Sequence, residues 1–286
     1  MRKTLATLVA LLTVILSWGQ AQINTKSVKI SDFTQKTTKI VLTGNELYDS
    51  SLKGDITAVW RISPYEFCTM EEFETLKTDD SYYFLLTTKG KAKNEKEASL
   101  QFLTLVKGGK DASKGINKML EIVSFPFAAA DFPSGREYVF FQAFLDIIQN
   151  YTLDAMEKDT NAYGGLAYYN FDISETDKMG IVFSINDLSE EVNKSVRDMY
   201  FDKDMIVVRE DDADSFLTDA VEGVLVSYVT APAEDTEGAY CYKMLIESSS
   251  HKLYYFRKHR LTKKKGPGFT QDDIRRITAK RKKEAE

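Results

Sequence analysis

An internal match between two segments constrains the fold of this chain more than any other feature. Lys39–Leu47 reads KIVLTGNEL and Gly180–Leu188 reads GIVFSINDL, so in each a branched apolar run leads into Asn and an acidic residue. Thr43 and Ser184 each stand three residues before an acid, which is the pattern of a capping box at the start of a helix. Both segments therefore predict a strand that runs into a helix.

The elements expected after each segment come in the same order. The expected strands are Asp55–Trp60, Tyr82–Thr88 and Leu100–Val106 in the first half, and Asp204–Val208, Val224–Thr230, Tyr240–Ile246 and Leu253–His259 in the second. The expected helices are Asn45–Leu52, Thr69–Leu76 and one from Ser113, and then Asn186–Tyr200, Asp211–Ala220 and one from Thr270. We infer a mixed α/β (α+β) fold of two similar β-α-β-α-β-β-α units, produced by duplication. Two unrelated α/β units whose first strands converged would give the same pattern.

A long apolar helix is expected between the two halves. Ser134–Met156 begins with a capping-box pattern, Ser134 with Glu137, and then repeats large apolar residues at intervals of three and four. So few polar positions remain that the helix needs cover on more than one side. We expect it to lie between the two units with Phe141, Phe144 and Ile148 buried; a dimer interface is the alternative.

The N-terminus has the pattern of an export signal. A basic start is followed by the apolar run Leu5–Leu16 and by a small-residue cleavage site that ends at Ala21. No cysteine follows that would accept a lipid anchor. We expect a periplasmic or extracellular protein, divided into residues 1–21 (signal peptide), 22–126 (first α/β repeat), 127–178 (connecting segment with the central helix), 179–262 (second repeat) and 263–286 (basic C-terminal helix and tail).

Charge is distributed unevenly along the chain. The formal net charge is −5, yet the stretch Arg257–Lys283 holds twelve Lys and Arg against two acidic residues. Glycine and proline in Lys263–Gly268 predict a joint about which the last helix swings free. Its candidate partner-binding residues are Arg275, Arg276, Lys280 and Arg281. An anionic membrane surface, an acidic glycan or a protein fits an exported chain better than nucleic acid, which is not expected as a partner. A solvated tail is the alternative.

Catalytic and metal-binding patterns are absent from the sequence. The chain has two histidines, His251 and His259, no nucleophile elbow, no zinc or calcium motif and no phosphate-binding loop. No cofactor is expected. A pair of carboxylates acting as a hydrolase remains open, because 43 acidic residues allow many pairs and the sequence singles out none.

Four tyrosines and two cysteines are the remaining candidates for a role. Tyr240, Tyr242, Tyr254 and Tyr255 lie on the last two strands and could present rings to a sugar or a peptide, or pack in the core. Cys68 and Cys241 could form a disulfide between the halves in an oxidising compartment, or remain buried as small apolar residues.

One short segment resembles the thioredoxin family. Ile56–Trp60, followed by Pro64 and Cys68, is similar to the strand and active-site turn of thioredoxins. The resemblance implies a thioredoxin-like topology in each unit. Tyr65 and Glu71 stand where the second cysteine of a Cys-x-x-Cys pair would be, so the redox chemistry of that family is not implied.

We therefore expect a non-catalytic binding protein of the cell envelope or extracellular space, whose partner is a protein or a glycan. The alternatives are an envelope hydrolase with an unidentified carboxylate pair and a degenerate thioredoxin-like protein.

Overall fold

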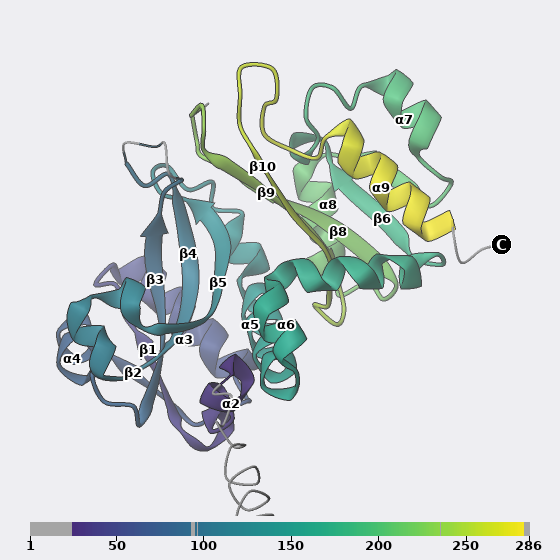
Figure 1. Ribbon diagram of the computed structural model, residues 1–286. Helices are drawn as coiled ribbons and strands as arrows, with labels where there is room; N and C mark the ends of the chain where they lie inside the picture. The colour runs from purple at the N-terminus through teal and green to yellow at the C-terminus, as the bar shows by residue number, and fades with distance from the viewer. Residues whose placement is uncertain (1–24, 93–94, 96, 235, 283–286) are drawn as a thin grey trace, which may run out of the picture.

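Two five-stranded sheets, one from each half of the chain, form the framework of the protein (Figure 1). The computed structural model describes residues 25–92, 95, 97–234 and 236–282. The first sheet has the spatial order β2-β1-β3-β4-β5. Its strands are β1 (Thr37–Val41), β2 (Tyr65–Cys68), β3 (Tyr82–Gly90), β4 (Leu100–Lys107) and β5 (Leu120–Ala129). β1 pairs in parallel with β2 and β3, whereas β3–β4 and β4–β5 are antiparallel.

The second sheet repeats this arrangement. Its strands are β6 (Gly180–Ser184), β7 (Met205–Val208), β8 (Val224–Thr230), β9 (Tyr240–Glu247) and β10 (Leu253–Arg260). Their order, β7-β6-β8-β9-β10, and their directions match those of the first sheet strand for strand. The parallel pairing of β1 with β3, and of β6 with β8, starts at the first residues of the strands, because Thr37 lies opposite Tyr82 and Gly180 lies opposite Val224. The mixed α/β fold with two similar units is confirmed.

The first unit has one strand, β5, that was not expected, whereas all five strands of the second unit were expected individually. In the first half the helix expected from Ser113 is wrong: two short 3-10 turns, η2 (Lys110–Lys114) and η3 (Ile116–Lys118), lead into β5. β5 contains Pro126, which an edge strand tolerates because no neighbour needs its N–H.

Two further expectations, both about the segments that connect parallel strands, were wrong. In the first unit α3 (Glu46–Val59) runs through the segment predicted as the strand Asp55–Trp60, and the strand β2 comes later. In the second unit the helix expected over 186–200 is divided into the 3-10 turn η5 (Ile185–Asp187) and α7 (Lys194–Tyr200). The remaining helices of the units are α2 (Lys26–Ile30), the 3-10 turn η1 (Phe33–Gln35), α4 (Met70–Leu76), α8 (Glu210–Thr218) and α9 (Gln271–Lys282).

Capping residues differ from expectation at the two matched segments. The Asp49 carboxylate, not that of Glu46, accepts from the backbone N–H groups of Thr43 and Gly44, at 2.8 Å each. Asp187 does not form the expected capping box with Ser184 either, because its carboxylate accepts from Arg136 and from the Ser227 hydroxyl. The capping boxes at the starts of α4 and α9 are confirmed, with Thr69 paired to Glu72 and Thr270 to Asp273.

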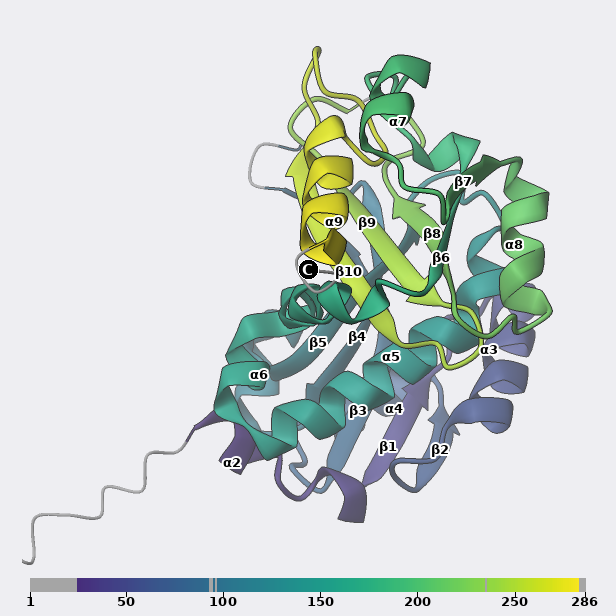
Figure 2. The same cartoon turned by 90° about the vertical axis from the view of Figure 1, so that its right-hand side faces the viewer.

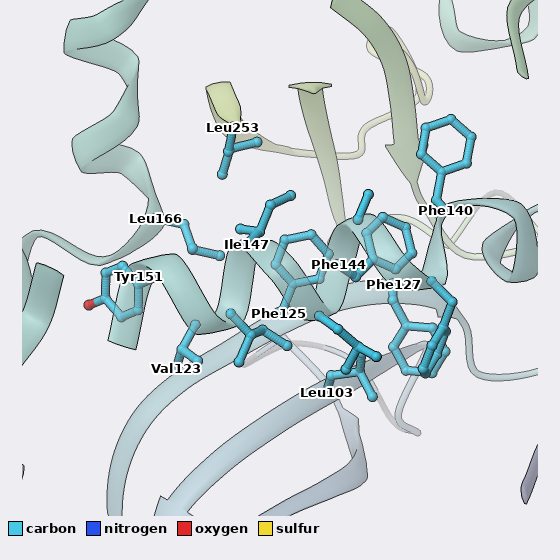
Figure 3. Packing of buried hydrophobic residues seen from close by; sticks show 14 of the residues in the cluster. Leu103, Val123, Phe125, Phe127, Phe140, Phe144, Ile147, Tyr151, Leu166 and Leu253 are labelled. Atoms are coloured by element: carbon cyan, nitrogen blue, oxygen red, sulfur yellow. The ribbon is translucent and has the colours of Figure 1, made fainter. Parts of the chain in front are cut away.

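The long apolar helix α5 (Glu137–Glu157) lies between the two sheets, as expected (Figures 1 and 2). The ring of Phe144 contacts Phe125 of β5 at 4.9 Å and Tyr228 of β8 at 5.0 Å. Figure 3 shows Phe144 and Ile147 of α5 among side chains from both units. Phe141, Phe144 and Ile148 are all buried, which confirms their predicted place. At the start of α5 the Ser134 hydroxyl accepts from Arg136 N–H, and not from the N–H of Glu137 as a capping box requires.

The two units turn opposite faces toward α5. Ile40 belongs to the core around α5, whereas its counterpart Ile181 belongs to the outer core with α7 and α9. The neighbouring residues Val41 and Val182 show the reverse. The first unit therefore presents its α3 face to the centre and the second its α8 face, so the arrangement is a tandem one without two-fold symmetry.

After α5 the chain continues through α6 (Asp159–Gly164) and the 3-10 segment η4 (Gly165–Thr176), and η4 runs beside β10. Within the described ranges, no helix has the length and apolarity to cross a membrane. The predicted signal peptide, residues 1–21, lies outside the described residues.

Candidate binding groove between the two units

A groove of about 600 Å³ lies between the first unit and the last two strands of the second. β4 and β5 form one side, β9 and β10 the other, and residues of α6 and η4 close one end. Ligand sites are common at such junctions between units. The side chains used below are Phe102, Tyr163, Asn170, Tyr242, Phe256 and Lys258.

Aromatic rings form the walls of the groove. The ring of Tyr242 lies between those of Phe102, at 6.0 Å, and Phe256, at 5.8 Å. Burial raises the pKa of Tyr242 to about 12, so its phenol stays neutral. Tyr163 borders the groove with 71% of its surface exposed. The groove therefore offers flat apolar faces together with a hydroxyl group.

Cations stand at the rim of the groove. The Lys258 ammonium lies over the ring of Tyr240, at 4.6 Å, and over that of Tyr242, at 5.7 Å. Within the described part of the chain Lys258 has no acidic partner within ion-pair distance. The Lys26 ammonium is already used, because it donates to the carbonyls of Ile122 and Ala162 at 3.0 and 3.1 Å.

The four predicted tyrosines divide between two faces of the sheet. Tyr240 and Tyr242 point to the groove side of the sheet. They are the two predicted tyrosines that the structure places together at the candidate site. Tyr254 and Tyr255 are buried in the outer core, where the Tyr255 hydroxyl donates to Asp273 at 2.7 Å. The groove residues Phe102, Phe256 and Lys258 were missed.

The basic helix α9 is fixed to the second unit, so the expectation that it swings free is wrong. Ile274 and Ile277 are fully buried. Arg281 is buried and donates to the carbonyl of Met179 at 2.9 Å, and Lys280 donates to that of Asn170 at 2.5 Å. Arg275 and Arg276 are exposed, but both pair with Asp272, at 2.8 and 2.7 Å. Two of the four predicted basic residues thus remain at the surface, and all four bind partners within the chain.

Cys68 and Cys241 are both free and buried, so the possible disulfide is not formed and the alternative of two buried thiols holds. Burial raises the pKa of each thiol to about 11, which keeps it protonated at neutral pH. The segment resembling thioredoxin does not fold as that resemblance implies either, because Ile56 belongs to helix α3. The thioredoxin-like topology is therefore not confirmed.

A buried ion cluster joins the start of α5 to the second unit. Arg136 forms ion pairs with Asp187, after β6, and with Asp214 of α8, at 2.9 and 2.7 Å. Ser227 of β8 adds a hydroxyl hydrogen bond to Asp187 at 2.6 Å. Desolvation raises the pKa of Asp187 to about 6 against the attraction of Arg136. All four residues are buried, so the cluster is enclosed and fastens α5 to the second unit.

A second buried cluster lies under α9. The fully buried ammonium of Lys243 donates to Asp273 at 2.6 Å and to His259 Nδ1 at 2.9 Å. Since an ammonium only donates, Nδ1 accepts, and the imidazole proton sits on Nε2, which donates to the Gly266 carbonyl at 2.9 Å. Burial, together with the charge of Lys243, lowers the pKa of His259. The neutral histidine thus holds the loop before α9.

His251 is the one histidine that faces an acid across the units in a geometry suited to catalysis. Its Nδ1 lies 2.8 Å from Asp146 of α5, and Asp146 also accepts from Arg61 at 2.8 Å. This pair would orient a general base. Neither residue lines the groove between the units, and their contacts tie the β9–β10 turn to α5 and to the segment after α3.

Neither a search for metal-ligand groups nor comparison with known proteins adds a further candidate site. Across the ranges that the structure describes, no three His, Cys, Asp or Glu side chains gather as a metal-binding group. No protein-family model, no curated protein and no solved structure matches the chain. The groove between the units is therefore the candidate site defined by the fold itself.

Proposed function

We propose that the chain is a non-catalytic binding protein of the cell envelope or extracellular space, and that it binds its partner in the groove between the units. The observation that carries the proposal is the aromatic wall of Tyr242, Phe102 and Phe256 beside Lys258, a cation with no ion pair among the residues that the structure describes. Aromatic and cationic side chains around a concave junction favour recognition of a polar chain molecule. Export rests on the pattern of residues 1–21.

The charged clusters support binding over catalysis. The Arg136 cluster is buried and internally paired, and the Lys243 cluster is likewise enclosed under α9. Hydrolysis is the second candidate, because His251 and Asp146 have the geometry of an oriented base. A hydrolytic activity lost in His251→Ala would favour that candidate.

The proposal is tested by comparing captured material between matched variants. The mature protein, Tyr163→Ala/Lys258→Ala and a control Lys194→Ala on α7 are immobilised and exposed to an envelope extract, a glycan array and a displayed peptide library. Tyr163 and Lys194 are exposed, so neither change should disturb folding. We expect ligands of the mature protein to bind the groove variant at least tenfold more weakly and the control equally well. Equal binding by the groove variant contradicts the proposal.

A further inference from the structure

The outer edge of β10 is an incomplete sheet edge beside the groove. β10 is the last strand of its sheet and pairs on one side with β9. The Asn170 side chain meets Phe256 on the open side: its amide donates to the Phe256 carbonyl at 2.8 Å and its oxygen accepts from the Phe256 N–H at 2.7 Å. One asparagine thus makes both hydrogen bonds that a neighbouring strand would make.

Backbone direction alternates along a strand, so Lys258 and Arg260 point their N–H and C=O groups to the same open side as Phe256. In the part of the chain that the structure describes, these backbone groups have no hydrogen-bond partner. An exposed edge of this kind is a template for an added strand. The edge is blocked at Phe256 and open at the two following positions.

We propose that an extended acidic segment of another protein adds to this sheet as a strand beside Lys258 and Arg260. The inference rests on the proposed function and names its partner class. Each of the two open residues supplies one backbone donor and one acceptor, so the partner segment gains up to four backbone hydrogen bonds. The side chains of Phe256 and Lys258 border the groove, where alternate side chains of the partner would lie.

The charges at this edge select an acidic partner. Lys258 has no ion pair among the described residues, and Arg260 donates to the Tyr240 hydroxyl at 3.2 Å, which lowers the pKa of Tyr240. A carboxylate on the added strand would pair with either cation. Pairing of two β10 edges from two copies would place these cations opposite like charges, which disfavours a second copy as the occupant.

Synthetic peptides test the inference directly. The probes are a fluorescent heptapeptide of alternating Glu and Val, its counterpart with Lys for Glu, and the acidic peptide with N-methyl groups on alternate residues. We expect the acidic peptide to bind the mature protein, the basic peptide to bind at least tenfold more weakly, and N-methylation to remove binding. Lys258→Glu should weaken binding of the acidic peptide at least tenfold. The matched change Lys263→Glu, on the exposed loop before α9, should leave that binding unchanged.

The outcomes separate this inference from the proposed function. Equal binding of the N-methylated peptide overturns strand addition but leaves the groove as a binding site. No binding of any peptide, with a glycan captured through Tyr163 and Lys258, also overturns it. A dimer in sedimentation experiments that survives Lys258→Glu and blocks the peptide would show that a second copy occupies the edge instead.

Discussion

Arg136 and Asp187 form a buried ion pair, with the guanidinium Nη1 2.9 Å from a carboxylate oxygen, across 51 positions of sequence. Arg136 immediately precedes α5, and Asp187 ends the turn that follows β6. The same guanidinium binds Asp214 of α8. One side chain therefore attaches the central helix to both the first turn and the second crossover helix of the second unit.

Replacing Arg136 should destabilise the protein strongly. Arg136→Met leaves the carboxylates of Asp187 and Asp214 buried and unpaired, and breaking such a pair costs about 3–5 kcal/mol. The free energy of unfolding, measured with urea at pH 7, should fall by that amount. The control is Arg209→Met, whose side chain is 84% exposed and pairs with Asp212 at the surface. We expect it to cost less than about 1 kcal/mol; equal losses in the two variants would contradict the account.

The core role of α5 gives a second prediction. Phe144→Ala removes a fully buried ring between the two sheets and should cost about 3–5 kcal/mol. Leu153→Ala, on the same helix but 40% exposed, is the control and should cost much less. Thermal or urea unfolding measures both. A Phe144→Ala protein of normal stability that changes its sedimentation would support the alternative of a dimer interface.

Much of the fold follows from local patterns in the sequence. The branched run Val224–Thr230 was predicted as a strand with the bounds that it has, and the capping boxes at Thr69 and Thr270 mark the starts of α4 and α9. These signals depend on neighbouring residues alone. The predicted order of two successive units is therefore correct even though the predictions for some single elements were wrong.

Other elements depend on tertiary packing, which a local pattern does not contain. Asp55–Trp60 has strand-like residues, but Ile56 and Val59 lie one turn apart on the buried side of α3. β5 was missed because a helix was expected from Ser113, in a segment that forms only 3-10 turns. Asp187 looks like a capping residue, yet a partner 51 residues away binds it.

The candidate site was predictable only in part. Aromatic spacing drew attention to Tyr240 and Tyr242, and the alternation of β9 places both on the groove side. In β10 the same alternation would place Tyr254 on the groove side with Phe256, but a register shift between Leu253 and Tyr255, which the sequence does not reveal, turns Tyr254 to the outer core. The period of two in β10 could have indicated Phe256 and Lys258, but Phe102 comes from the other unit and carries no local signal.

Acidification should destabilise the protein through His259. Burial and Lys243 lower its pKa, so the unfolded chain binds this proton more readily. The contribution of neutral His259 to the stability is therefore fully present above the ordinary histidine pKa of about 6.5 and is lost as the pH falls below it. Urea unfolding between pH 7.5 and 5.0 should show a steeper loss for the natural protein than for His259→Gln. Asp187, whose raised pKa acts in the opposite sense, is common to both proteins and cancels in the comparison; parallel curves would refute this role of His259.

Neither half of the chain should fold alone. Residues 25–158 contain the first unit with α5 but expose the side of α5 that packs on the second unit, including Phe140. Residues 179–282 expose the face that α5 covers, including Val226 and Tyr228. We expect both fragments to aggregate, since a large exposed apolar face favours association. A soluble fragment with dispersed NMR spectra would show that its unit does not need the shared core.

Hydrogen exchange in the full-length protein tests the shared core most directly. Because α5 belongs to the cores of both units and forms the junction at which the groove lies, β3 and β8 should open together. Mass spectrometry of peptides from both strands, over a series of low urea concentrations, should give the same opening free energy and the same urea dependence. Opening of β8 at a clearly lower free energy, with β3 still protected, would contradict the claim that one helix unites the two units.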